Sequence, residues 1–142
     1  MPFPSEADRR TLLQWARQVV VEAVLHGRLA QKIPEGGIFA ERRGVFVTLR
    51  SVRRLRGCIG VIEDEEALGA SIARCAAGAA LQDPRFAPLR AADLHDLQIE
   101  ISLLSLPVPI DPAEIEIGRH GLLVPGARTV AFCSRRWPSN TI

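Results

Sequence analysis

The hydrophobic pattern near the start of the chain predicts one long amphipathic helix. Apolar side chains recur at helical spacing over residues 12–24, and polar side chains fall largely on the other side. Ser5 followed by Asp8 fits an N-cap with an acidic first turn. Gly27 fits the glycine that commonly follows the last helical residue. We therefore expect a helix that begins after Ser5 and ends before Gly27.

Further along the chain, the pattern changes to one that is typical of β-strands. Residues 45–49 and 55–62 are rich in β-branched and apolar side chains, and the turn at 50–54 would join them into a hairpin. This turn contains no glycine, which weakens the hairpin prediction. Residues 97–106 alternate between apolar and polar side chains, which predicts a third strand with one polar face.

An alanine-rich helix is predicted between the hairpin and the third strand, over about residues 65–81. The acidic run at 63–66 would complement the helix dipole in the first turn. Cys75 lies on the apolar stripe of this helix, and we interpret it as a small buried side chain.

Composition and charge narrow the class of protein. The chain has 142 residues, 47% hydrophobic and 24% charged, which is ordinary for one globular core. A net charge of +2 is too small to indicate nucleic-acid binding. No apolar run has the length of a membrane helix and the N-terminus does not resemble a signal peptide, so we expect a cytoplasmic protein without membrane association.

The cysteines and other polar residues predict neither a metal nor a cofactor. Cys58, Cys75 and Cys133 include no Cys-x-x-Cys pair, which argues against a disulfide framework and a structural zinc site. The sequence also contains no phosphate-binding loop and no spacing typical of a catalytic triad.

One stretch in the second predicted strand is the strongest candidate for a functional site. Glycine within a strand marks a bulge, or the close approach of another backbone or a ligand. In a regular strand two residues that are two positions apart face the same way, which would place a cation beside a thiol. We call this stretch the signature; it consists of Leu55, Arg56, Gly57, Cys58, Ile59 and Gly60.

Two hypotheses of different classes follow from the signature. In the first, Cys58 is a nucleophile or a redox-reactive thiolate assisted by Arg56, with His95 or His120 as a possible base. In the second, the strand is the floor of a binding or scaffold module, and Cys58 is structural. We favour a structural Cys58, because cysteine is commonly buried and the spacing of neither histidine places it near the thiol.

Arg56 needs its own explanation, because arginine is rarely buried without a partner. It could bind a carboxylate or phosphate group of a ligand. It could instead pair with an internal carboxylate, such as Asp83 or Glu100.

Several spaced motifs, in addition to the signature, resemble landmarks of one known family. They are residues 44–49, the alanine-rich helix, Asp83-Pro84-Arg85-Phe86, residues 99–105 and residues 118–122. In this order they resemble the AMMECR family, whose prokaryotic members are often called AmmeMemoRadiSam system protein A. The resemblance covers roughly residues 5–124.

The resemblance implies an α+β fold with two subdomains, each carrying an antiparallel sheet and packed helices. The signature would face a cleft between the subdomains, in a family without a settled biochemical activity. In the binding-module hypothesis a protein or peptide partner would occupy this cleft, and family association points to Memo-like and radical-SAM proteins of a modification pathway. The binding residues implied are the six of the signature together with Asp83, Arg85, Phe86 and His120.

The chain departs from the family pattern at Pro125, so we divide it into an AMMECR-like domain at 1–124 and a non-family tail at 125–142. The codons that Cys133 to Asn140 permit, read one base out of register, can spell Leu-Leu-Pro-Gln-Val-Ala-Val-Glu. This string resembles the family segment that is missing here. We therefore expect the tail to be a frameshift product, and the larger subdomain to lack its closing elements and to be marginally stable.

Overall fold

The computed structural model describes residues 3–52, 54–62, 65–117 and 120–122. These residues form two α-helices, three strands and three short 3₁₀ turns, so the predicted α+β class is confirmed. The elements are α1 (Glu6–His26), η1 (Gly37–Ala40), β1 (Val45–Ser51), β2 (Arg54–Val61), α2 (Leu68–Leu81), η2 (Ala91–Asp96), β3 (Leu97–Leu103) and η3 (Pro112–Glu114).

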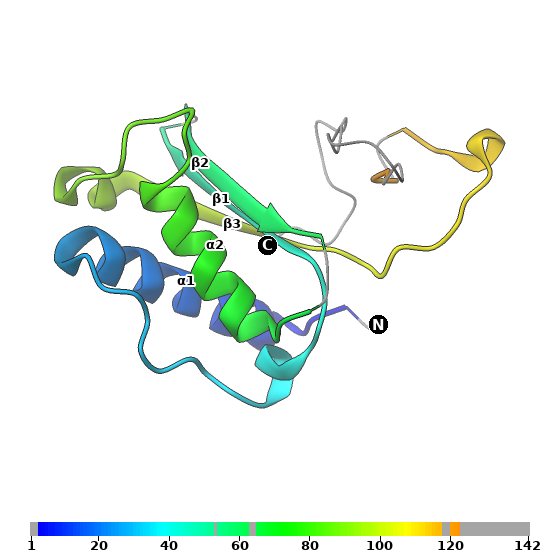
Figure 1. The fold of residues 1–142 in the computed structure, drawn as a ribbon, viewed down its shortest axis with the longest axis horizontal. Helices are drawn as coiled ribbons and strands as arrows, with labels where there is room; N and C mark the ends of the chain where they lie inside the picture. Colours follow the sequence, from blue (N-terminus) through cyan, green and yellow to red (C-terminus); the bar gives the residue numbers. More distant parts are fainter. Residues whose placement is uncertain (1–2, 53, 63–64, 118–119, 123–142) are drawn as a thin grey trace.

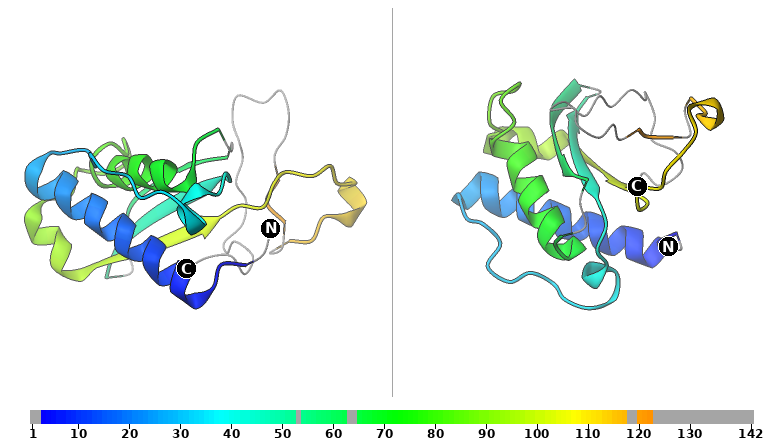
Figure 2. Two further views of the ribbon diagram at one scale, coloured as in Figure 1. Left: turned by 90° about the horizontal axis from the view of Figure 1, so that it is seen from below. Right: turned by 45° about the vertical axis from the view of Figure 1, so that its right-hand side comes forward.

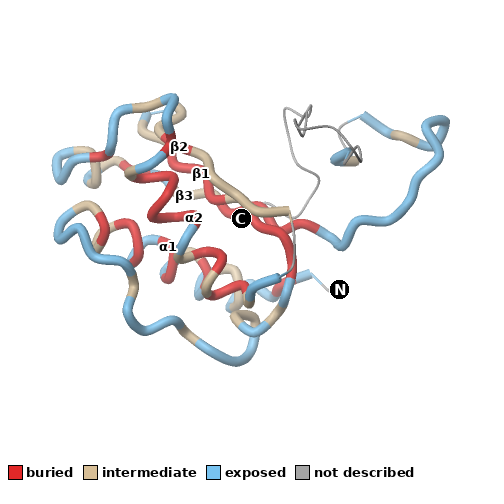
Figure 3. The backbone as a smooth tube through the Cα atoms, in the orientation of Figure 1, coloured by how far each residue is buried: buried red, intermediate tan, exposed pale blue. Residues whose placement is uncertain are grey.

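The three strands form one antiparallel sheet in the order β2-β1-β3, and both helices pack on the same face of it (Figures 1 and 2). Val45, Val47 and Leu49 of the central strand belong to the core and are fully buried, and Figure 3 shows buried backbone along much of β1 and both helices. The segment after β3 runs away from the helix and sheet layers and is largely exposed. The described residues form this one sheet, so they do not include the second sheet that the resemblance implies.

The ends of α1 confirm the prediction from sequence. The Ser5 hydroxyl accepts a hydrogen bond from the Asp8 N–H at 3.1 Å, and the Asp8 carboxylate accepts one from the Ser5 N–H at 3.1 Å. This reciprocal capping box satisfies donors that the first turn leaves free. Gly27 closes the helix with a φ of 61°, which glycine adopts without steric strain. Among the described helices, none is both long enough and apolar enough to cross a membrane.

The start of α2 differs from the prediction. The helix begins at Leu68 and has no acidic residue in its first turn, so the expected dipole role of the acidic run is wrong for the described residues of that run. Contacts with distant segments fix the first turn instead. The Leu68 N–H donates to the Glu41 carbonyl at 2.8 Å, and the Trp15 indole N–H donates to the Gly69 carbonyl at 2.9 Å.

The predicted hairpin is confirmed, with a turn of only two residues between β1 and β2. Val52 occupies the first turn position with a φ of 43°, and its side chain is 74% exposed. A β-branched residue in this left-handed conformation is strained, and tight hairpin turns favour asparagine or glycine there.

Replacing Val52 with asparagine should therefore stabilise the domain by about 1 kcal/mol, because asparagine tolerates the left-handed conformation better. Urea unfolding followed by circular dichroism measures the change. Val108→Asn is the matched control, since Val108 is 76% exposed and has no positive φ. An equal effect of both substitutions would contradict the assignment of strain to Val52.

Candidate functional site

The signature lies on β2, and the strand is interrupted there by a β-bulge. Leu49 of β1 pairs with Gly57 whereas the next residue, Arg50, pairs with Leu55, so Arg56 is an extra residue on β2. A bulge was one of the two reasons that the sequence offered for glycine in this strand. The bulge also breaks the regular alternation from which we expected Arg56 and Cys58 to face the same way.

The two signature glycines allow close contacts within the protein itself. A Cβ atom on Gly57 would lie 2.0 Å from the carbonyl oxygen of Ala79, so this glycine lets α2 approach β2 directly. A Cβ atom on Gly60 would lie 2.3 Å from the ring of Phe46, its cross-strand partner. Packing of the protein's own helix and aromatic ring thus accounts for both glycines without a ligand.

The Arg56 guanidinium pairs with a carboxylate that the sequence did not suggest. Its Nη1 donates to Asp93 Oδ1 at 3.2 Å, and both side chains are largely buried. The N–H of Arg90 and the Arg56 guanidinium both bind the Asp93 carboxylate and lower its pKa. The two predicted partners are otherwise engaged, because Glu100 lies 3.8 Å from Arg50 and Asp83 binds Arg85.

Asp83 and Arg85 together hold the backbone of Cys58 at the outer edge of the sheet. Asp83 Oδ2 accepts a hydrogen bond from the Cys58 N–H at 2.9 Å, and Arg85 Nη2 lies 3.4 Å from the Cys58 carbonyl oxygen. Arg85 also donates to both oxygens of Asp83, at 3.1 and 2.8 Å. We call this arrangement the edge clamp, because it supplies the hydrogen bonds that a neighbouring strand would otherwise make.

The electrostatics of the edge clamp favour the charged state. The Asp83 side chain is only 2% exposed, and the hydrogen bond from Arg85 outweighs this burial and holds the Asp83 pKa well below its usual range. The Arg85 guanidinium lies 5.2 Å from the centre of the Phe86 ring, which fixes its orientation further. The structure thus brings Asp83 and Arg85 to the backbone of Cys58, and Phe86 to Arg85.

The Cys58 thiol lies on the face of the sheet that the helices leave free. Its Sγ is 3.3 Å from Thr48 Oγ1, and the side chain is half-buried. Cys58, Thr48 and Glu100 occupy matching register positions on β2, β1 and β3. They form a row of a thiol, a hydroxyl and a carboxylate, which we call the polar row.

The two histidines considered as bases are held elsewhere. The His95 ring contacts the carbonyl of Ala92 within η2, and the His120 Nδ1 accepts a hydrogen bond from the Glu116 N–H at 3.0 Å. Each ring therefore contacts its own segment of chain.

Thr48 and Asp93 belong to the site but were not predicted from the sequence. The hairpin register could have indicated Thr48, whereas no local signal links Asp93 to Arg56.

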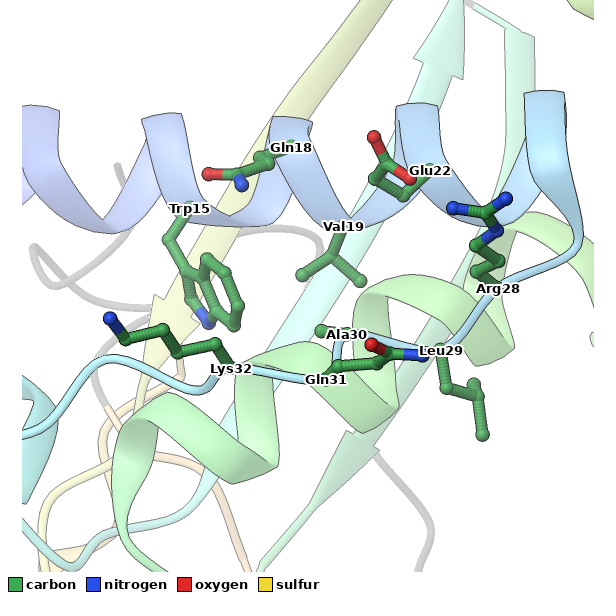
Figure 4. A pocket seen from close by; sticks show the side chains of 9 residues that line it. All are labelled: Trp15, Gln18, Val19, Glu22, Arg28, Leu29, Ala30, Gln31 and Lys32. Carbon is green, nitrogen blue, oxygen red and sulfur yellow. The ribbon is translucent and has the colours of Figure 1, made fainter.

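A separate pocket of about 190 Å³ lies between α1 and the loop that follows it (Figure 4). None of the predicted site residues lines this pocket. Nor do the described residues contain a group of three or more side chains suited to a metal ion. The lining residues are Trp15, Gln18, Val19, Glu22, Arg28, Leu29, Ala30, Gln31 and Lys32.

Comparison with known proteins gives consistent matches. The sequence model of the AMMECR1 family matches residues 13–132. A protein of Methanothermobacter thermautotrophicus is 37% identical over 129 residues, covering 84% of this chain and 67% of the relative. Protein MK0488 of Methanopyrus kandleri is 39% identical over 129 residues, covering 83% and 62%.

A solved structure agrees with this result. The crystal structure of the uncharacterized protein PH0010 from Pyrococcus horikoshii matches with a TM-score of 0.70 and 30% identity, covering 77% of this chain and 60% of that one. The chain therefore spans about two thirds or less of these relatives.

The residues after 122 lie outside the described part of the chain, so the domain boundary at 124 and the frameshifted tail stay predictions.

Proposed function

The chain belongs to the AMMECR1 family, and from this premise we propose that it is a binding module whose signature strand receives a partner protein or peptide. The edge clamp is the observation that carries this proposal. It fixes the backbone of Cys58 through two hydrogen bonds and leaves the thiol on the helix-free face of the sheet. A strand that is held rigidly in this way presents a preformed surface to a partner.

The polar row supports binding more than catalysis. A catalytic cysteine needs a base or a cation that activates the thiol. The nearest such candidate in sequence, Arg56, is bound to Asp93, and the described contact of the Cys58 sulfur is the hydroxyl of Thr48. The half-buried thiol and the half-exposed Glu100 carboxylate of this row remain accessible to a partner, while buried Thr48 holds the thiol in place.

The proposed partner is a Memo-like or radical-SAM protein, the classes to which the family resemblance points. The proposed place of action is the cytoplasm. In support of this, Cys58 and Cys75 are both free thiols, as is usual in reducing compartments.

The rate of alkylation at Cys58 distinguishes the two hypotheses, a binding module and a cysteine-dependent enzyme. We expect iodoacetamide to label native Cys58 more slowly than glutathione at the same pH, because the side chain is half-buried. We also expect labelled protein to lose capture of a Memo-like protein from the same organism, since the label would project from the binding face. Mass spectrometry of the peptides measures the first result, and affinity capture the second.

Cys75 provides an internal control for this experiment. It is fully buried, and burial raises the pKa of its thiol to about 11, so it should label only on unfolding. Labelling of Cys58 at about ten times the rate of glutathione or faster would favour the enzyme. Unchanged capture after complete labelling would argue against the helix-free face as the binding surface.

A further inference from the structure

We propose that the hairpin end of the sheet is a docking surface for an acidic segment of the partner protein. The hairpin end is defined here as Val52, Arg54, Arg56 and Arg90. This inference rests on the proposed function, that the domain is a binding module, and adds the chemistry of the partner.

The hairpin end lies beside the segment that follows α2 (Figure 1), and side-chain contacts join the two. Ser51 donates a hydrogen bond to the Asp96 carboxylate at 2.8 Å, which ties the hairpin to η2. Asp93 of η2 binds Arg56 at 3.2 Å and lies 3.9 Å from the Arg90 guanidinium. Arginines from β2 and from the start of η2 thus come together although they lie far apart in the sequence.

The acidic and basic side chains at the hairpin end differ in how far they are exposed. The carboxylates turn inward: the Asp93 side chain is 17% exposed, and half-buried Asp96 accepts the bond from Ser51. Two of the three arginines are exposed, since the Arg90 side chain is 84% exposed and Arg54 is exposed as well, whereas the Arg56 side chain is 23% exposed and bound to Asp93. The most exposed charges of the hairpin end are therefore those of Arg54 and Arg90, while Asp93 and Asp96 are less exposed. Guanidinium groups bind carboxylates with paired hydrogen bonds, so an acidic segment is the complementary ligand.

Val52 adds an apolar contact at the same surface. Its side chain is 74% exposed at the tip of the hairpin, in a backbone conformation that asparagine or glycine would adopt with less strain. Strained conformations are concentrated at functional sites, where the local cost is offset by a role in binding. An exposed valine two positions before the exposed Arg54 fits a segment that combines acidic residues with an apolar one.

A peptide fits this surface better than a nucleic acid does. The chain's net charge is only +2, and Asp93 and Asp96 lie just behind the arginines. A phosphate backbone of regularly spaced charges would meet these carboxylates, whereas a folded or flexible peptide can place its few carboxylates on the guanidinium groups.

Fluorescence anisotropy with a short labelled peptide of glutamates and leucines tests the proposal on the full chain. We expect binding that weakens with salt, and that weakens about fivefold or more when Arg54 and Arg90 are both replaced by glutamine. Arg10→Gln is the matched control, since this α1 side chain is 70% exposed and also paired with a carboxylate, Glu6. Val52→Asn should weaken binding about twofold while it raises stability, which separates recognition from folding.

Three results would overturn the inference: equal binding of the double variant, equal binding of a peptide with glutamine in place of glutamate, or tighter binding of a single-stranded RNA. If the double variant does not fold, Arg90→Gln alone serves, because its highly exposed side chain adds little to stability. If the peptide test fails but labelling of Cys58 still blocks capture of the Memo-like protein, only the docking surface at the hairpin end is rejected. The proposed binding module then stands. If the acidic peptide binds but labelling of Cys58 has no effect on capture, the hairpin end stands as a docking surface. The helix-free face of the sheet is then rejected as the binding surface.

Discussion

Gly57→Ala should destabilise the domain by about 3 kcal/mol or more, enough to unfold a large fraction of it at moderate temperature. The added Cβ would lie 2.0 Å from the carbonyl oxygen of Ala79 and 2.8 Å from its carbonyl carbon. Both atoms belong to the backbone of α2, so no side-chain rotation can relieve the overlap. The helix would have to move away from the sheet and open the core that Leu49 and Ile72 help to fill.

Thermal and urea unfolding of the purified variants measure this effect. Gly78→Ala is the matched control, because a Cβ there would lie at an ordinary 3.6 Å from the Ile59 side chain. Alanine is also favoured over glycine within a helix, so Gly78→Ala should be neutral or stabilising by up to about 1 kcal/mol. A Gly57→Ala variant as stable as the Gly78→Ala variant would contradict the close contact between α2 and β2.

Asp83→Asn should lower the free energy of unfolding by about 2 kcal/mol at neutral pH. The substitution keeps the size of the side chain but removes the charge that binds Arg85 and the backbone N–H of Cys58. We keep this figure below that of a fully buried ion pair, because the Arg85 side chain is 57% exposed and solvent screens it.

The same variant should change how stability depends on pH. The pKa of Asp83 is lowered in the folded protein, so its contribution is present above the unfolded pKa of about 3.9 and is lost as the pH falls below that value. The difference between wild type and Asp83→Asn should therefore shrink from pH 4 downward, by roughly the amount seen at neutral pH. Urea unfolding at a series of pH values measures it.

Glu100→Gln is the control for Asp83→Asn. Its carboxylate is 39% exposed and lies 3.8 Å from Arg50, so we expect a loss of less than about 1 kcal/mol. A pH-independent difference between wild type and Asp83→Asn would show that the charge of the edge clamp adds nothing to stability.

The sequence predicted those features of the fold that depend on contacts between residues close together in the chain. Ser5, Asp8 and Gly27 mark the ends of α1 because capping involves residues within one turn of each other. The first turn of α2 could not be predicted in this way. Its position depends on the Glu41 carbonyl and the Trp15 indole, which belong to segments distant in the sequence.

The candidate site shows the same division. The signature, Asp83, Arg85, Phe86 and His120 were predicted to share a site. The structure places Asp83 and Arg85 at the Cys58 backbone and Phe86 against Arg85, whereas His120 contacts Glu116. The pairing of Arg56 with Asp93 could not be predicted, because it depends on a bulge and on a contact across 37 positions of sequence. From the sequence we could select Arg56 and Cys58 as candidates. We could not predict that Arg56 binds Asp93 while the Cys58 thiol contacts Thr48.

The edge clamp also has a consequence for how copies of the protein behave at high concentration. Strand β2 is an outer strand, and an outer strand with free N–H and carbonyl groups can pair with the same strand of a second molecule. Asp83 and Arg85 occupy these groups at Cys58 and place a fixed pair of opposite charges where a second backbone would need to lie. The pair is therefore expected to limit the growth of the sheet between molecules at this position of β2.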